Sequence, residues 1–104
     1  MSDIAEAARR TRVRVTVEVL GVVRDLVGGP FEELVLPEPG TTRQALGLLA
    51  ALYPGLVGPV LEADGCTPNA YYLVNLEGRQ FVQDLDEPLP EDSHLVLMSA
   101  IGGG

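Results

Sequence analysis

The segment from Val13 to Val19, VRVTVEV, constrains the fold of this chain more than any other stretch. Valines occupy every odd position and polar residues every even one. This period of two is the signature of a β-strand that buries one face and exposes the other. The segment therefore predicts a strand in a sheet whose valine face is covered by another layer.

The next segments predict a hairpin. Residues 21–30, GVVRDLVGGP, contain the turn-forming run Gly28-Gly29-Pro30 and are expected to reverse the chain. Residues 31–36 would then return as a second strand, which Pro37 and Gly40 bring to an end.

A helix is expected from Thr41 onward. Thr41 and Gln44 have the spacing of a capping box, in which each side chain accepts a hydrogen bond from the other residue's backbone. Pro54-Gly55 ends the helix. The apolar stripe expected to face the sheet is Ala45, Leu48, Leu49 and Leu52.

The second half predicts further strands. Residues 56–67 are ambiguous, and Val57, Val60 and Leu61 would suit a short second helix. The remaining predicted elements are strands at 71–76, 79–82 and 94–99, with an acidic loop at 84–93 before the last strand. The resulting order, β-β-α-β-β, favours an α+β fold: a mixed sheet of four to five strands with one main helix across one face. The last strand is the most continuously apolar and is expected in the centre of the sheet.

Composition narrows the class of protein. A chain of 104 residues suits a single domain. The formal charge of −8 argues against nucleic acid as a partner, because phosphates attract a basic surface. No apolar run reaches the ~20 residues of a membrane span, so no membrane partner is expected. The single cysteine excludes an internal disulfide, and we expect a cytoplasmic protein.

Few side chains are candidates for catalysis. Cys66 has Asp64, Gly65 and Thr67 around it in sequence, none of which would lower the pKa of a thiol. His94 is the single histidine and is expected to be structural, with no sign of a dyad with Cys66. Together they are too few for a zinc site. The acidic residues of loop 84–92 lack calcium-binding spacing and are expected to be solvated, with a basic partner surface as the alternative.

The chain ends in Ile101-Gly102-Gly103-Gly104 directly after the last predicted strand. This ending, with the element order, resembles the β-grasp (ubiquitin-like) fold and, within it, the MoaD/ThiS family of sulfur carriers, which includes the small subunit of molybdopterin synthase. Other similar segments are 13–19 followed by 23–28, the helix at 41–54, Leu73-Val74-Asn75 with Gly78, and residues 89–93. The resemblance covers residues 12–104, with 1–11 as a disordered N-terminal extension and 101–104 as a flexible tail. It departs from the family in having three terminal glycines instead of two, so the family's pair is placed on Gly103 and Gly104.

The resemblance implies that the working group is the carboxylate of Gly104, with Gly102 and Gly103 as the narrow tail that enters a partner. Four extended residues reach about 12–14 Å, and glycine lets the tail approach a nucleotide closely. A ubiquitin-activating-type adenylating enzyme would use ATP and Mg²⁺ to adenylate Gly104, and sulfur transfer would then give a thiocarboxylate. The chain itself would bind no cofactor or metal and would carry no catalytic residue.

Several functions remain open at this point. The sulfur acceptor would be a synthase, with the large subunit of molybdopterin synthase favoured and thiazole or cysteine biosynthesis as alternatives. A ubiquitin-like modifier joined through Gly104 to lysines would use the same activated carboxylate. All seven basic residues are arginine, so the chain could not form lysine-linked polymers on itself. A non-catalytic binding module is the third alternative.

Overall fold

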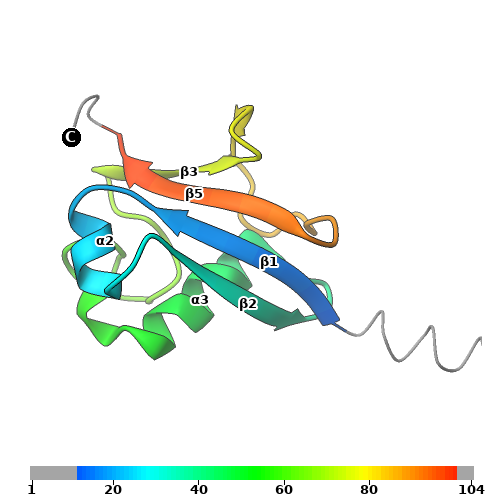
Figure 1. The fold of residues 1–104 in the computed structure, drawn as a ribbon, viewed down its shortest axis with the longest axis horizontal. Helices are drawn as coiled ribbons and strands as arrows, with labels where there is room; N and C mark the ends of the chain where they lie inside the picture. Colours follow the sequence, from blue (N-terminus) through cyan, green and yellow to red (C-terminus); the bar gives the residue numbers. More distant parts are fainter. Residues whose placement is uncertain (1–11, 101–104) are drawn as a thin grey trace, which may run out of the picture.

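Five strands form one mixed sheet, and helix α3 packs across one of its faces (Figure 1). The computed structural model describes residues 12–100. Its elements are β1 (Arg12–Val19), α2 (Val22–Val27), β2 (Phe31–Pro37), α3 (Thr42–Leu52), a 3-10 turn η1 (Pro54–Leu56), β3 (Tyr72–Leu76), β4 (Gln80–Phe81) and β5 (Ser93–Ser99). The sheet order is β2-β1-β5-β3-β4, so the prediction that the last strand is central is confirmed. The pairing of β1 with β5 is parallel, and the other pairings are antiparallel.

The alternation in β1 has the predicted consequence. Val13, Val15, Val17 and Val19 are all buried in the core. They point to the same side as Leu34 and Leu36 of β2, which pair with Val15 and Val13. Each fully buried aliphatic side chain contributes roughly 1.5–3 kcal/mol by removal from water. This strand therefore supplies four of the 19 buried hydrophobic side chains of the described residues.

Helix α3 begins with the predicted capping box: Gln44 N–H donates to Thr41 Oγ1 and Thr41 N–H donates to Gln44 Oε1. Its buried face was only partly predicted. The residues buried against the sheet are Thr42, Ala45, Leu46, Leu49 and Ala50. Leu52, expected in the stripe, is 51% exposed. The buried set keeps the i, i+3, i+4, i+7 spacing but starts at Thr42, which rotates the stripe away from Leu52.

Two connecting segments differ from expectation. Residues 21–30 are more than a turn, because they contain α2, whose Val23 and Val27 are buried in the core. The helix ends at Gly28, which adopts the left-handed conformation at φ 83°. Residues 57–61 form no second helix; η1 precedes them, and Val60 and Leu61 are buried from irregular backbone.

Among residues 12–100, no helix has both the length and the apolar character needed to span a membrane.

Candidate functional site

The two faces of β5 have different roles. Leu95 and Leu97 are fully buried, whereas Val96 and Met98 are partly exposed on the opposite face. The sequence left this parity open, because all four residues are apolar. In the structure Leu95 and Leu97 join the core. Val96 and Met98 therefore belong to the outer face of the sheet, away from α3.

Strand register shows which residues accompany them. Met98 pairs with Leu73, and Val96 pairs with Asn75 on β3. On the other side, Val96 pairs with Glu18 of β1, which in turn pairs with the 53% exposed Phe31 of β2. We call four apolar residues of this face the outer patch: Phe31, Leu73, Val96 and Met98. The outer patch extends along β5 toward Ser99, the end of the strand that precedes the glycine tail in sequence.

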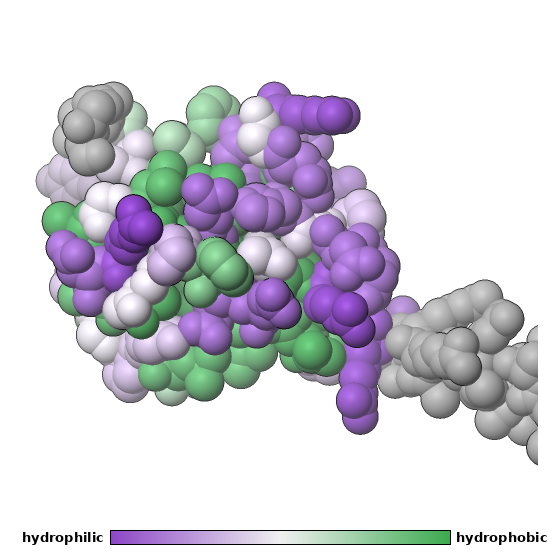
Figure 2. All heavy atoms as spheres, in the orientation of Figure 1, coloured by the Kyte–Doolittle hydropathy of each residue, from purple (hydrophilic) through white to green (hydrophobic). Residues whose placement is uncertain are grey.

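Polar groups interrupt this face. The ring nitrogen Nε2 of His94 lies 2.8 Å from Oε1 of Glu18, and His94 N–H donates to Glu77 Oε2 at 2.8 Å. Figure 2 shows the same pattern over the face it presents, with green apolar residues interspersed among purple ones and purple densest where β1 begins. The structural role expected of His94 is therefore a side-chain contact with Glu18, which links β5 to β1 on the outer face of the sheet.

The glycine tail itself, Gly102, Gly103 and Gly104, lies outside the described residues. The structure describes the chain as far as Ala100, whose N–H donates to Tyr71 O at 2.7 Å. This bond continues the β3–β5 ladder by one residue beyond the Tyr72–Ser99 pair. Tyr71 is 63% exposed at this point. The backbone that carries the tail is therefore fixed to the sheet directly before the last four residues.

Cys66 lies in the loop before β3, partly buried. Three hydrogen bonds to Asp64 shape this loop: Cys66 N–H, Thr67 N–H and the Thr67 hydroxyl all donate to its carboxylate. The Thr67 hydroxyl is the main cause of a lowered pKa for Asp64. The structure adds one neighbour that sequence proximity missed, since Arg43 Nη1 lies 3.9 Å from Cys66 Sγ.

Cys66 and His94 have different partners, Arg43 and Glu18 respectively, so they form no dyad. Within residues 12–100 no group of three or more His, Cys, Asp or Glu side chains is arranged to hold a metal ion. The acidic side chains of loop 84–92 are exposed, as expected, although the loop is also anchored to the body of the protein. Leu89 is buried in the core, and Arg43 Nε donates to Asp86 Oδ1 at 2.7 Å.

Comparison with known proteins gives a likeness of structure. No family model matches the sequence, and no curated protein matches it either. Among solved structures, small archaeal modifier protein 1 (SAMP1) of Haloferax volcanii has a TM-score of 0.74 at 20% identity, covering 88% of this chain and 99% of its own. SAMP1 of Methanosarcina acetivorans has a TM-score of 0.73 at 18% identity, covering 89% of this chain and 98% of its own.

A third similar structure is a candidate molybdopterin converting factor, subunit 1, of Pyrococcus furiosus. Its TM-score is 0.68 at 22% identity, and the match covers 84% of this chain and 97% of that one. All three align over nearly their whole length with the mixed sheet and the crossing helix described above. The chain therefore has the β-grasp, ubiquitin-like fold that its sequence predicted.

Proposed function

We propose that this protein is a sulfur carrier whose C-terminal carboxylate, on Gly104, is converted to a thiocarboxylate. The observation that carries the proposal is the position of the tail. The central strand β5 ends at Ser99, and Ala100 and then Ile101-Gly102-Gly103-Gly104 follow it in sequence. Glycines contribute little to packing and cost conformational entropy when ordered, so their place after a central strand is best explained by use in a partner's channel.

The proposed chemistry takes place in partner proteins. A ubiquitin-activating-type adenylating enzyme joins the Gly104 carboxylate to the AMP part of ATP and releases pyrophosphate, with Mg²⁺ bound by that enzyme. A sulfide-level donor then displaces AMP and leaves the terminal thiocarboxylate. This chain contributes the carboxylate, the narrow tail and a rigid body.

The outer patch is the docking surface in this proposal. Leu73 of β3 pairs with Met98 of β5. Met98 directly precedes Ser99, the last residue of β5. Leu73, Val96 and Met98 lie together on the paired strands β3 and β5, and neighbouring apolar side chains beside polar groups are typical of protein interfaces. Glu18 lies between Phe31 and Val96, with the ring of His94 beside it, and its charge would fix the register of a partner, because electrostatic complementarity favours the correct alignment.

The acceptor of the sulfur is proposed to be a molybdopterin-type synthase, with the large subunit as partner. The likeness to the Pyrococcus furiosus converting-factor candidate favours this acceptor. A second function has its own support, because two of the similar structures are small archaeal modifier proteins. In that case the Gly104 carboxylate would be joined to lysine side chains of other proteins.

Intact-mass measurement tests the proposal. The full chain is incubated with ATP, Mg²⁺, a ubiquitin-activating-type enzyme from the same genome and a sulfide donor. The expected product gains the mass difference between sulfur and oxygen. The control variant lacks Gly103 and Gly104 and should stay unchanged. Conjugates of higher mass on immunoblots of cell lysate, without the sulfur adduct, would support the function as a protein modifier. Full function of the truncated variant in cells would contradict both the sulfur-carrier and the modifier function.

A further inference from the structure

A cavity of about 690 Å³ opens between β3–β4 and the acidic loop, near the residues that precede the start of β5. Its wall includes Pro90, three residues before β5 begins, whereas the tail follows the other end of this seven-residue strand. At about 3.3 Å per residue, the strand separates the two ends by roughly 20 Å. None of the outer-patch residues lines the cavity, so the two surfaces are distinct.

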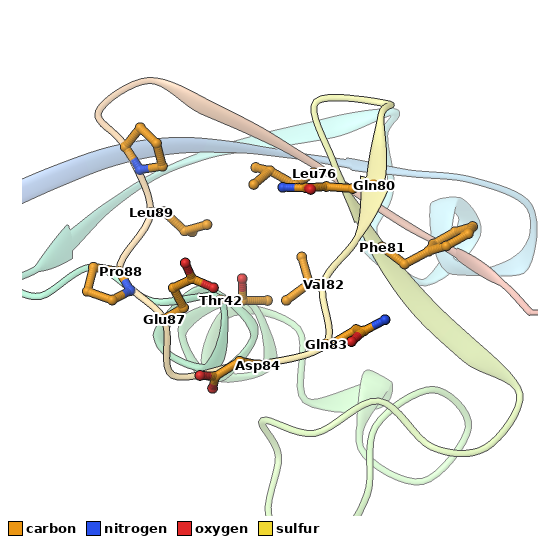
Figure 3. A pocket seen from close by; sticks show the side chains of 11 residues that line it. Thr42, Leu76, Gln80, Phe81, Val82, Gln83, Asp84, Glu87, Pro88 and Leu89 are labelled. Carbon is orange, nitrogen blue, oxygen red and sulfur yellow. The ribbon is translucent and has the colours of Figure 1, made fainter.

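The lining is acidic and apolar. Its charged residues are Asp84 and Glu87, and its other members include no arginine, lysine or histidine. The apolar wall consists of Leu76, Val82 and Leu89. In Figure 3 the carboxylate of Glu87 points into the space between Leu89 and Thr42. A ligand for this cavity needs an apolar stem and a positively charged, hydrogen-bond-donating head.

A buried hydroxyl lacks a partner at the inner end of this cavity. Thr42 is fully buried, and its Oγ1 makes no hydrogen bond. Figure 3 shows its side chain directed from the first turn of α3 toward the cavity that Val82 and Glu87 also line. An unsatisfied buried polar atom costs about 1–3 kcal/mol. A donor group that reached Oγ1 would relieve this cost.

The start of α3 does not favour an anion here. The Arg43 N–H donates to Leu85 O and the Gln44 N–H to Thr41 Oγ1, so these two amides are already used within the protein. The helix dipole contributes about half a positive charge, against two formal negative charges on the lining. The balance of charge favours a cation.

An exposed aromatic ring beside the cavity favours a protein segment, rather than a small free ion, as the source of this cation. Phe81 lies on β4, an edge strand of two residues. Its side chain is 56% exposed beside the mouth and turns away from the cavity in Figure 3. A small free cation would leave this ring in water, whereas residues flanking a bound side chain would cover it.

We propose that this cavity binds an arginine or lysine side chain presented by a segment of a partner protein. Glu87 and Thr42 hold the charged head, and Leu76, Val82 and Leu89 surround the stem. The flanking residues of the segment pack on Phe81. The site does not depend on the chemistry of the tail, so a protein bound here and an enzyme acting on Gly104 can hold the molecule at the same time.

Titration of the ¹⁵N-labelled full chain with the peptide acetyl-Ala-Leu-Arg-Leu-Ala-amide tests this site. The expected result is chemical-shift change confined to residues 76–90 and around Thr42. The same peptide with citrulline in place of arginine keeps the shape but removes the charge, and should bind about tenfold more weakly, as expected for loss of a charged hydrogen bond. Equal binding of the two peptides, or no change in these residues, would overturn the proposal.

Variants locate the effect. Glu87→Gln should reduce binding of the arginine peptide about tenfold, and Thr42→Val about threefold. Asp25→Asn, which removes one exposed charge from α2, serves as the matched control and should bind normally. A Glu87→Gln variant with unchanged affinity would refute the site.

Agmatine, a free guanidinium compound, tests the nature of the occupant. It should bind much more weakly than the peptide; if it bound equally well, the protein segment would be the wrong occupant. Deletion of Gly103-Gly104 should leave binding intact, which separates this test from that of the tail.

Discussion

The guanidinium of Arg43 contacts both carboxylate oxygens of Asp86, with Nε–Oδ1 at 2.7 Å and Nη2–Oδ2 at 3.2 Å. A third nitrogen, Nη1, donates to Thr67 Oγ1 at 3.1 Å. One side chain on α3 therefore holds two loops that are far apart in sequence, the acidic loop and the loop before β3. The hydrogen bond from Arg43 lowers the pKa of Asp86, and the same bond raises the pKa of Arg43.

This pair predicts a pH dependence on the acid side. Because the pKa of Asp86 is lower in the folded state, its contribution to the free energy of unfolding is complete above the ordinary carboxyl pKa of about 4. It is lost as the pH falls through the lower folded value. Asp86→Asn should reduce stability slightly at neutral pH, since the pair is exposed, and should flatten the loss of stability in acid. Urea unfolding across that range checks this, with Glu62→Gln as the control for loss of one exposed carboxylate; an unchanged acid slope in Asp86→Asn would contradict it.

A second pH dependence is expected on the alkaline side. The Tyr53 hydroxyl donates to Glu32 Oε1, which ties the end of α3 to β2 and raises the pKa of Tyr53. A raised folded pKa gives stability that is complete below the ordinary tyrosine value of about 10 and is lost as the pH rises through the folded value. Glu32→Gln should therefore bring the pKa of Tyr53 down. Carbon NMR of the assigned tyrosine rings measures it, and a Tyr53 titration that did not move would contradict the prediction.

Gly40 predicts a large loss of stability on substitution. Its φ is +72°, and a Cβ built there would overlap the side chain of Val13. Gly40→Ala should cost on the order of 2–4 kcal/mol, from overpacking and from left-handed backbone. Gly28→Ala is the matched control, because Gly28 has φ +83° but open space at its Cβ, so only the backbone cost of about 1 kcal/mol remains. Equal losses in the two variants, measured by urea unfolding, would show that contact with Val13 is unimportant.

The unpartnered hydroxyl of Thr42 predicts a stabilising substitution. Thr42→Val keeps the shape of the side chain and removes a buried oxygen that makes no hydrogen bond, so the free protein should gain about 1 kcal/mol. Thr42→Ser keeps the oxygen and removes the methyl group, and should lose stability. Thermal and urea unfolding decide the sign. A less stable Thr42→Val would mean that the hydroxyl has a partner in solution.

Local patterns predicted the elements that depend on neighbouring residues alone. The β1 alternation and the Thr41–Gln44 capping box are both set by spacing along the chain, and both are present in the structure. Helix α2 was missed because the glycines at both ends of residues 21–30 indicated a turn. A signal was available in Val23 and Val27, which have the i, i+4 spacing of a helix face and are both buried.

Other features depend on tertiary contacts that no spacing encodes. The face of β5 that is buried follows from its register with β1 and β3, since its run of apolar residues fits either parity. The neighbour of Cys66 is Arg43, which is 23 positions away. The cavity likewise combines Thr42 from α3 with residues 76–90. Tyr71, expected as the first residue of a strand, precedes β3 and is exposed.

The two faces of β5 predict opposite outcomes for neighbouring substitutions. Leu97 is fully buried in the core, so Leu97→Ala should cost about 2–5 kcal/mol of stability through the cavity it leaves. Met98 lies on the outer face beside Leu73, so Met98→Glu should cost about 1 kcal/mol or less. If the outer patch docks the adenylating enzyme, Met98→Glu should nevertheless abolish ATP-dependent release of pyrophosphate, because a charge then enters an apolar interface. Urea unfolding and a pyrophosphate assay with the enzyme from the same genome measure both properties. A folded Met98→Glu protein that is activated as fast as the parent would remove the outer patch from the docking surface, while leaving the role of the tail to be judged by its own truncation.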